Sequence, residues 1–239
     1  MIDDYFGEIF FTLIVLTGFI IHWLAVSLNW QKLQPVSKPL AMVLLIAWTV
    51  LLVPRSASWS LGLLIAAQIF GLIGDIFLLF RGKWFLFGMA AFMVGHLFYI
   101  GTLLVALIDF FQDGSEISRL PIKVLVYMMT SAGILIFFYW MFKPMRNPDN
   151  VHPPVWAAEQ VYSWVLSELV AMSFFFVLLL GSDSLQPYFL PLGAFLFLFS
   201  DTLLAYNKFI QPFQTAHIWE IMTYHLAQFS LAIGFLSII

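Results

Sequence analysis

Three carboxylic acids stand inside long apolar stretches, where a charged group is costly. Asp75, Glu168 and Asp201 each have at least five mainly apolar residues on either side. An ionisable residue at such a position marks a functional site by default, and its carboxyl group can give up and take back a proton. The alternative is a structural hydrogen bond that holds two helices together. The depth of the three acids favours function over structure.

The elements that carry these acids are predicted to be membrane-spanning helices. Of the 239 residues, 62% are hydrophobic and only 10% are charged, with a mean hydropathy of +0.97, whereas about a quarter of the residues of a soluble domain are charged. A spanning helix needs roughly 20 mainly apolar residues. The apolar runs lie near residues 9–28, 39–53, 60–80, 84–108, 121–142, 160–180, 187–206 and 217–239. We therefore predict an all-α polytopic membrane protein, a bundle of eight transmembrane helices that forms a single domain over residues 1–239.

Glycine and proline residues separate the predicted helices. The breakers lie at Pro35 and Pro39, Pro54, Gly82, Gly114 and Pro121, the stretch 144–154, Gly181 and Pro187, and Pro212. The run 39–53 is short for a span, so we expect it to take residues from its flanks.

Composition excludes several classes of function. A net charge of −3 argues against nucleic-acid binding, and the absence of cysteine from the sequence excludes disulfides, thiol catalysis and cysteine-ligated metals. No cofactor is predicted. The N-terminus carries Asp3, Asp4 and Glu8 instead of the basic start of a signal peptide, so the first apolar run is expected to stay.

The basic residues favour one orientation in the membrane. The loops after the odd-numbered helices hold Lys32, Lys38, Arg81, Lys83, Lys143, Arg146 and Lys208, and the other side holds Arg55, Arg119 and Lys123. Positive charge favours the cytoplasmic side, so both termini are predicted to be non-cytoplasmic. The expected location is the cell membrane in a bacterium or the endoplasmic reticulum in a eukaryote.

Polar residues are predicted to gather in the cytoplasmic half of the bundle. Asp75 and Asp201 each stand five residues before the end of their apolar runs, which places both roughly 8 Å from the cytoplasmic edge. His96 would lie some 18 Å from that edge, with Tyr99 one turn further on nearly the same face. Lys38, Asn207 and Lys208 would lie at the edge itself, and Tyr224 about 10 Å below it.

Several of these residues belong to motifs that resemble the lysoplasmalogenase family, also called YhhN-like. The motifs are Lys38-Pro39-Leu40, Gly71-Leu-Ile-Gly74-Asp75-Ile-Phe-Leu78, Gly88-Met-Ala-Ala-Phe92-x-x-Gly95-His96-Leu-Phe-Tyr99, Gly193 to Ser200-Asp201-x-Leu-Leu-Ala205-x-Asn207-Lys208-Phe209, and Met222-Thr-Tyr224-x-Leu-Ala-Gln228. The resemblance implies a lipid hydrolase that cleaves the vinyl ether bond of lysoplasmalogens to a fatty aldehyde and glycerophosphoethanolamine or glycerophosphocholine. It implies Asp75 and Asp201 as the intramembrane aspartates, and His96, Tyr99, Asn207, Lys208, Tyr224 and Gln228 as pocket positions. It assigns no role to Glu168.

Two carboxyl groups suit this reaction. Protonation of the outer vinyl carbon gives an oxocarbenium ion, which water captures as a hemiacetal that collapses to aldehyde and alcohol. Two neighbouring carboxyl groups away from bulk water can supply an acid and a base, because one holds a proton while the other is ionised. Either aspartate could take either part, and His96 could replace one of them as proton carrier. Lys38 and Lys208 could hold the substrate phosphate, or serve only as interfacial lysines.

Two other classes of function remain open from the residues alone. Buried acids in a helical bundle also describe a proton-coupled transporter or channel, although the helices that carry the acids show no central break. A zinc hydrolase could use His96, His225 and an aspartate, but the sequence has no H-E-x-x-H or comparable spacing. The oligomeric state has no signature in the sequence.

Overall fold

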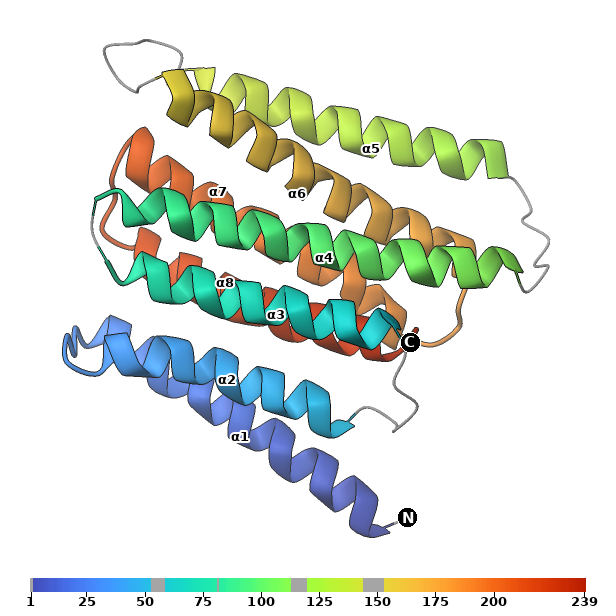
Figure 1. The fold of residues 1–239 in the computed structure, drawn as a ribbon, viewed down its shortest axis with the longest axis horizontal. Coiled ribbons are helices and arrows are strands. Elements are labelled where there is room, and N and C mark those ends of the chain that lie inside the picture. Colours follow the sequence, from blue (N-terminus) through green and yellow to red (C-terminus); the bar gives the residue numbers. More distant parts are fainter. Residues whose placement is uncertain (1, 53–58, 81, 113–119, 144–152) are drawn as a thin grey trace. The chain divides into compact units, whose positions relative to one another are not determined.

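The computed structural model describes residues 2–52, 59–80, 82–112, 120–143 and 153–239, and these residues form helices joined by turns (Figure 1). No β-strand occurs in these ranges. The helices are α1 (Ile2–Ser27), α2 (Gln34–Leu52), α3 (Trp59–Leu78), α4 (Trp84–Gln112), α5 (Leu120–Met141), α6 (Pro153–Leu180), the short 3-10 helix η2 (Gln186–Tyr188), α7 (Phe189–Phe209) and α8 (Ala216–Leu236). Each of the eight α-helices overlaps one predicted run, so the predicted all-α class is confirmed.

Three helices begin several residues earlier than predicted, and the first of them is α1, which begins at Ile2 instead of residue 9. α2 begins at Gln34, so Pro39 lies inside the helix and does not start it; a proline inside a membrane helix is tolerated because neighbouring groups satisfy the freed backbone. This extension supplies the length that the short run lacked. α6 begins at Pro153 instead of residue 160. The predicted breakers Gly82 and Gly181 both adopt positive φ, of 75° and 55°, just after α3 and α6. Pro54, Gly114 and most of the stretch 144–154 lie outside the described residues.

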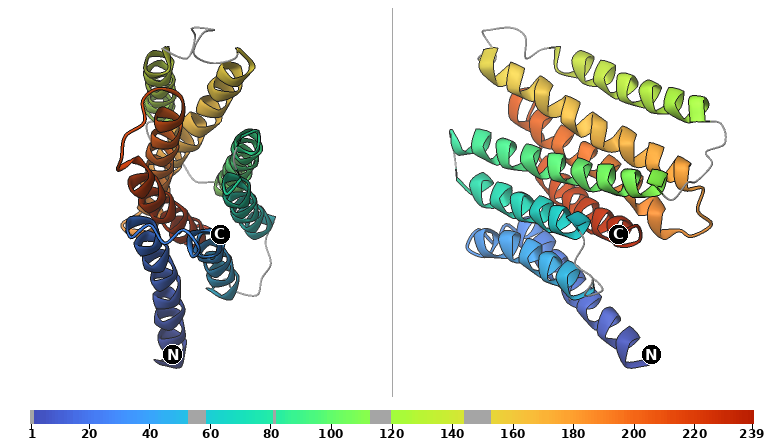
Figure 2. Two further views of the ribbon diagram at one scale, coloured as in Figure 1. Left: turned by 90° about the vertical axis from the view of Figure 1, so that its left-hand side faces the viewer. Right: turned by 45° about the vertical axis from the view of Figure 1, so that its right-hand side comes forward.

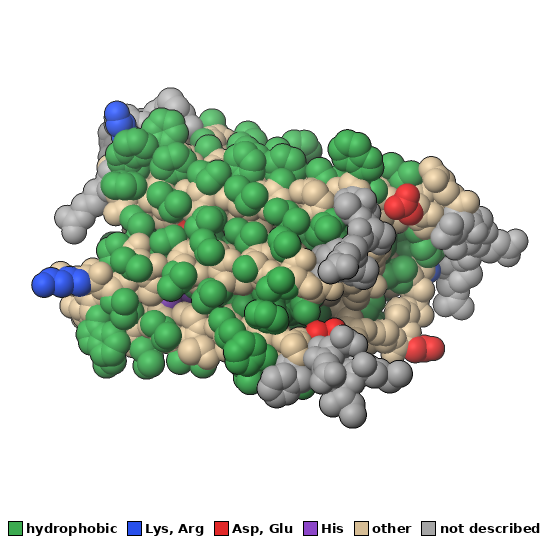
Figure 3. Space-filling view, turned by 60° about the horizontal axis from the view of Figure 1, so that its bottom comes forward, with side chains coloured by type: hydrophobic (Ala, Val, Ile, Leu, Met, Phe, Trp, Pro, Cys, Tyr) green, Lys and Arg blue, Asp and Glu red, His purple; other side chains and the backbone are tan. Residues whose placement is uncertain are grey.

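Seven of the described helices are long and apolar enough to cross a membrane, and α8 is the exception. The polar residues Glu220, His225 and Gln228 lower the hydropathy of α8, and all three are buried. Large hydrophobic side chains are exposed along the other helices, from Ile9 and Leu13 to Phe195 and Phe199. Figure 3 shows such side chains covering much of one face. In water this surface would be unfavourable, and in lipid it is the expected exterior. The chain is an integral multi-pass membrane protein.

The chain divides into two compact units, residues 1–95 and 96–239, with the boundary inside the continuous helix α4. The predicted single domain over residues 1–239 stays a prediction. In the first unit α2 packs against both α1 and α3 (Figure 1). Its core includes Phe19, Met42, Leu45 and Leu64, which are fully buried.

In the second unit α7 packs most closely on α8, while α6 contacts both α5 and α7 (Figure 2). A Cβ atom at Gly193 would lie 2.7 Å from the backbone nitrogen of Leu231, and one at Gly234 would lie 2.6 Å from that of Leu190. Two glycines thus allow backbone-to-backbone approach of α7 and α8, as small residues do in membrane helix pairs. This contact fixes the position of Asp201, two turns beyond Gly193 on α7.

Candidate functional site

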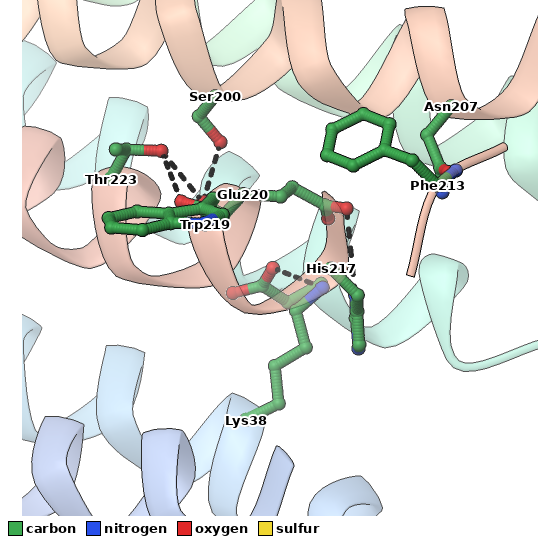
Figure 4. A network of polar contacts seen from close by, with 9 residues as sticks. Lys38, Ser200, Asn207, Phe213, His217, Trp219, Glu220 and Thr223 are labelled. Atoms are coloured by element: carbon green, nitrogen blue, oxygen red, sulfur yellow. Dashed lines mark hydrogen bonds and ion pairs between the residues drawn. The ribbon is translucent and has the colours of Figure 1, made fainter. Parts of the chain in front are cut away.

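In the first unit, Asp75 forms a buried ion pair with Lys38. Nζ of Lys38, from the second turn of α2, lies 3.2 Å from Oδ1 of Asp75, near the end of α3. The two side chains are 8% and 1% exposed. Figure 4 shows the ammonium group of Lys38 turned toward this carboxylate. The sequence placed Lys38 at the membrane edge, either as a phosphate ligand or as an interfacial lysine, whereas the structure shows its ammonium group paired with a buried acid.

The glycines beside Asp75 serve helix packing. A Cβ atom at Gly74 would meet the ring of Phe92 at 2.8 Å, and one at Gly95 would lie 3.0 Å from the carbonyl oxygen of Ala67. Because neither glycine has a side chain, α4 packs directly against α3, and Asp75 has no exposed surface.

In the second unit, Asp201 accepts a hydrogen bond from the phenol of Tyr162 on α6. Asp201 and Tyr162 are each 9% exposed. The donor comes from a helix in which the sequence showed no recognisable motif. A hydrogen bond from a phenol satisfies and orients one carboxyl oxygen of Asp201.

His96 lies beside this pair with unused hydrogen-bonding capacity. It is 1% exposed, and within the described part of the chain neither of its ring nitrogens has a hydrogen-bond partner. Its ring stands edge-on to Phe197, with 4.4 Å between centroids, and to Tyr162, at 5.6 Å. Buried polar atoms are normally paired, so the two ring nitrogens of His96 are available to a polar atom of a ligand or to a water molecule.

Three further predicted residues join this part of the second unit. The hydroxyl of Tyr99 donates to Oε1 of Gln228 at 2.5 Å, and the Tyr99 ring stacks on Phe235. Tyr224 stands edge-on to Phe197, at 5.4 Å, and Phe197 is the ring that contacts His96. The structure thus gathers His96, Tyr162, Asp201, Phe197 and Tyr224 into one group, which we call the His96 cluster.

Several other polar residues of α7 and α8 have structural partners (Figure 4). Ser200 donates to the carbonyl oxygen of Glu220 at 2.9 Å, and Glu220 lies 3.5 Å from His217. Oδ1 of Asn207 accepts the backbone N–H of Phe213 at 3.0 Å, which closes the turn between α7 and α8. Lys208 is exposed at the end of α7. Asn207 therefore shapes the loop, and Lys208 keeps the exposed position expected of an interfacial lysine.

The two aspartates stand at different distances from the ends of their helices. α3 ends at Leu78, three residues after Asp75, while α7 continues to Phe209, eight residues after Asp201. The spacing of five residues that the sequence suggested for both is wrong, because each apolar run misjudged its helix end by two or three residues. The predicted distances of His96 and Tyr224 from the start of their helices change by no more than about one turn, since α4 begins at Trp84 and α8 at Ala216.

Glu168, the third intramembrane acid, forms a link between α5 and α6. Its two carboxyl oxygens accept hydrogen bonds from Tyr127, at 2.5 Å, and Ser131, at 2.7 Å. Both partners lie on α5, so the acid has the arrangement of an inter-helix lock.

The substitution Glu168→Gln is expected to leave turnover largely intact and to lower stability by about 1 kcal/mol, the scale of a hydrogen bond between membrane helices. The amide oxygen still accepts one of the two hydroxyl hydrogen bonds. Thermal unfolding in detergent and turnover would be measured on the same preparation. Complete loss of turnover in a folded variant would make Glu168 a third acid of the site.

Within the described ranges no three His, Cys, Asp or Glu side chains converge in a way that could hold a metal ion. The zinc-hydrolase alternative therefore has no ligand set there.

Comparison with known proteins gives one family and one relative. The model of the YhhN family matches residues 33–235. The chain is 26% identical over 207 residues to the mouse (Mus musculus) protein "Lysoplasmalogenase TMEM86B", an alignment that covers 86% of this chain and 76% of the relative. No solved structure matches the chain. The matched region includes all the residues of the His96 cluster together with Lys38 and Asp75.

Proposed function

Because this chain belongs to the YhhN family, we propose that it is a membrane-embedded hydrolase that cleaves the vinyl ether bond of lysoplasmalogens. The relative named as a lysoplasmalogenase supports the reaction class. The structural observation that carries the proposal is His96, a buried histidine whose two ring nitrogens have no partner among the described residues and whose ring contacts Tyr162, the hydrogen-bond donor to Asp201. This arrangement offers proton donors and acceptors in an apolar surrounding, which vinyl ether hydrolysis requires.

The reaction needs one proton and one water molecule. An acid protonates the outer vinyl carbon, and the ether oxygen stabilises the resulting cation as an oxocarbenium ion. A base takes a proton from water as its oxygen bonds to the cationic carbon, which gives a hemiacetal. The hemiacetal then expels the glycerol oxygen, which takes up a proton. The products are a fatty aldehyde and glycerophosphoethanolamine or glycerophosphocholine, and the acid and base return to their starting forms.

We assign roles from the neighbours of each aspartate. Asp75 has a cation at 3.2 Å, which suits a carboxylate that stays ionised, stabilises the oxocarbenium ion and accepts a proton from water. Asp201 accepts a hydrogen bond from Tyr162, whose ring contacts that of His96, which suits a carboxyl group that passes a proton to and from the substrate. His96 assists this transfer. Tyr99, Tyr224 and Gln228 shape the pocket, and Lys208 binds the phosphate at the membrane surface.

The main rival is a proton-coupled transporter or channel. Helices α3 and α7 run without interruption through Asp75 and Asp201, whereas helices at the substrate sites of many transporters are broken. One set of proteoliposomes distinguishes the hydrolase from the transporter or channel. The proposal predicts fatty aldehyde by mass spectrometry after addition of a lysoplasmalogen, with no proton flux above protein-free vesicles. Flux without aldehyde would establish the rival.

We also propose that the loops after the odd-numbered helices face the cytoplasm, so that both termini are non-cytoplasmic. The native chain has no cysteine, so a single introduced thiol reports alone. The variant Lys208→Cys, at an exposed position after α7, should react with a membrane-impermeant maleimide only when the cytoplasmic side is accessible. Labelling from the opposite side would reverse the orientation.

A further inference from the structure

Glu159 on α6 is a buried acid that the assigned roles leave unused. The sequence placed it just outside the predicted run of residues 160–180. In the structure the apolar span of this helix begins at Val155, so Glu159 lies inside the span, four residues after its start. Its side chain is 3% exposed. An ionisable group inside a span is costly, so its burial requires either a structural or a functional reason.

The hydrogen bonds of Glu159 do not join helices. Its Oε1 accepts a hydrogen bond from the hydroxyl of Ser163 at 2.5 Å, and its Oε2 accepts one from the side-chain amide of Gln160 at 2.6 Å. Both donors belong to α6 itself, whereas Glu168 on the same helix takes both of its donors from α5. Among the described residues no cation forms an ion pair with Glu159. Unlike Glu168, this acid is therefore not an inter-helix lock.

Glu159 shares the buried face of α6 with Tyr162. Residues three apart on a helix are neighbours on its surface, and both of these are buried, while Val161 and Trp164 are 50% and 54% exposed. Side chains on a helix point back toward its start, so the ring of Tyr162 extends toward the turn that carries Glu159. A carboxyl group and a phenol in this arrangement can exchange a proton directly or through one water molecule.

The depth of Glu159 places it between the membrane surface and Asp201. Helices α6 and α7 run in opposite directions, so the start of α6 and the end of α7 lie at the same side of the second unit (Figure 1). Glu159 is about 6 Å and Tyr162 about 10 Å from the start of the α6 span, and Asp201 is about 12 Å from the end of the α7 span. The similar depths of Tyr162 and Asp201 agree with the hydrogen bond between them. From the surface inward, the order is Glu159, Tyr162 and Asp201.

The proposed reaction requires a proton route to Asp201. When Asp201 protonates the vinyl carbon it is left ionised, and the proton that the attacking water gives up goes to the base instead. The next turnover begins only after Asp201 has regained a proton, although the overall reaction neither consumes nor releases one. Asp201 is buried, so this proton passes through neighbouring groups. Chains of acids form such relays inside membrane proteins.

From these observations we propose that Glu159 is a proton-relay residue that returns a proton to Asp201 after each turnover. The carboxyl group of Glu159 gives a proton to the phenol oxygen of Tyr162, as the phenol hydrogen moves along its hydrogen bond to Asp201. Glu159 then takes a proton from water at the membrane surface. One proton enters from this water for each proton that Asp201 gives to the substrate, and the base releases one to the solvent. The inference rests on the proposed function for the identity of the reaction.

The kinetic test follows aldehyde release by Glu159→Gln after a long incubation without substrate. Asp201 is then protonated, so the first turnover should keep the parent's rate and give a burst of about one aldehyde per chain. Later turnovers wait for the proton, and kcat should fall by about 10²-fold, the lower end of the contribution of a positioned acid or base. Glu168→Gln makes the same change at another acid of α6 and is the matched control, with the parent's kcat and no burst. Glu159→Asp keeps a carboxyl group and should regain most of the parent's kcat.

Two kinetic results would overturn the relay. A slow first turnover in folded Glu159→Gln would place the effect on the chemical step or on the fold. A kcat equal to the parent's without a burst would show that Glu159 carries no proton. Thermal unfolding in detergent checks the fold of each variant. If Glu159→Gln does not fold, Glu159→Leu takes its place with the same expected results, because leucine leaves no buried polar group at this position.

Infrared spectroscopy of the purified full chain tests the relay without substrate. After transfer to heavy water, the carboxyl band of protonated Asp201, identified by its loss in Asp201→Asn, shifts as deuterium replaces hydrogen. This exchange should be about 10²-fold slower in Glu159→Gln, as for kcat, and unchanged in Glu168→Gln. Equal rates in Glu159→Gln and the parent, or no such band in the parent, would overturn the relay. If the parent releases no aldehyde, the proposed function fails, while the exchange rates still decide whether Glu159 supplies protons to Asp201.

Discussion

Asparagine in place of Asp201 is expected to reduce aldehyde release to the level of a protein-free sample while the protein stays folded. The amide oxygen can still accept the hydrogen bond from Tyr162, so the contact between α6 and α7 survives. An amide cannot cycle a proton, and the reaction requires a group that does so at each turnover. Turnover by mass spectrometry and thermal unfolding in detergent are measured together. Near-normal turnover would contradict the paired-carboxylate mechanism.

Asparagine in place of Asp75 should also stop turnover, but with a loss of stability that Asp201→Asn lacks. Lys38 would be left as a buried charge without its partner, and breaking a buried ion pair in this way costs about 3–5 kcal/mol. The double variant Lys38→Met with Asp75→Asn removes both charges and should regain most of that stability. It should still release no aldehyde. Turnover by the stable double variant would show that Asp75 serves the fold alone.

The substitution His96→Ala is expected to lower kcat by about 10²–10⁴-fold, the usual contribution of a positioned acid or base. The ring of His96 contacts that of Tyr162, and among the described residues its two nitrogens have no hydrogen-bond partner, so they are available for proton transfer. KM should change less than kcat, because the ring lies away from the surface that holds the head group. Steady-state kinetics over a range of substrate concentrations separates the two parameters.

The variant His96→Gln distinguishes a hydrogen-bonding role of His96 from a proton-transfer role, because glutamine can donate and accept hydrogen bonds but does not titrate. We expect this variant to be as slow as His96→Ala. His217→Ala, at a histidine side chain that is 54% exposed, is the matched control and should keep the parent's kcat. If His96→Gln restored turnover, His96 would serve as a hydrogen-bonding residue only.

Most of the fold could be predicted from the sequence because membrane spans have a strong signal. Twenty or so apolar residues in a row have few alternatives to a spanning helix, and each predicted run overlaps an observed one. The errors lie where polar residues or proline continue a helix, as in α2 before Pro39 and α6 before Gln160. α8, predicted as the eighth span, is not among the described helices that are apolar enough to cross a membrane, since a helix that buries polar side chains against its neighbours is less apolar than one that faces lipid.

The candidate site could be predicted only in part. The aspartates and His96 were found because an ionisable residue in an apolar run stands out, and the resemblance to a family reinforced them. Tyr162 was missed, because a tyrosine in a membrane helix is common and α6 showed no motif. The pairing of Lys38 with Asp75 was missed as well, since a lysine near a helix end normally extends to the membrane surface. The Tyr162–Asp201 and Lys38–Asp75 contacts depend on which helices are neighbours in space. Neither the periodicity nor the spacing of residues in the sequence gives that information.

Hydrolysis of a lysoplasmalogen in heavy water by the purified protein tests the central claim most directly. If the vinyl carbon is protonated from the solvent and water attacks the cation, mass spectrometry should show a fatty aldehyde with one carbon-bound deuterium next to its carbonyl group. The glycerophosphoethanolamine or glycerophosphocholine product should carry no carbon-bound label. Release of aldehyde without this deuterium, or no aldehyde release in samples of folded protein, would contradict the account.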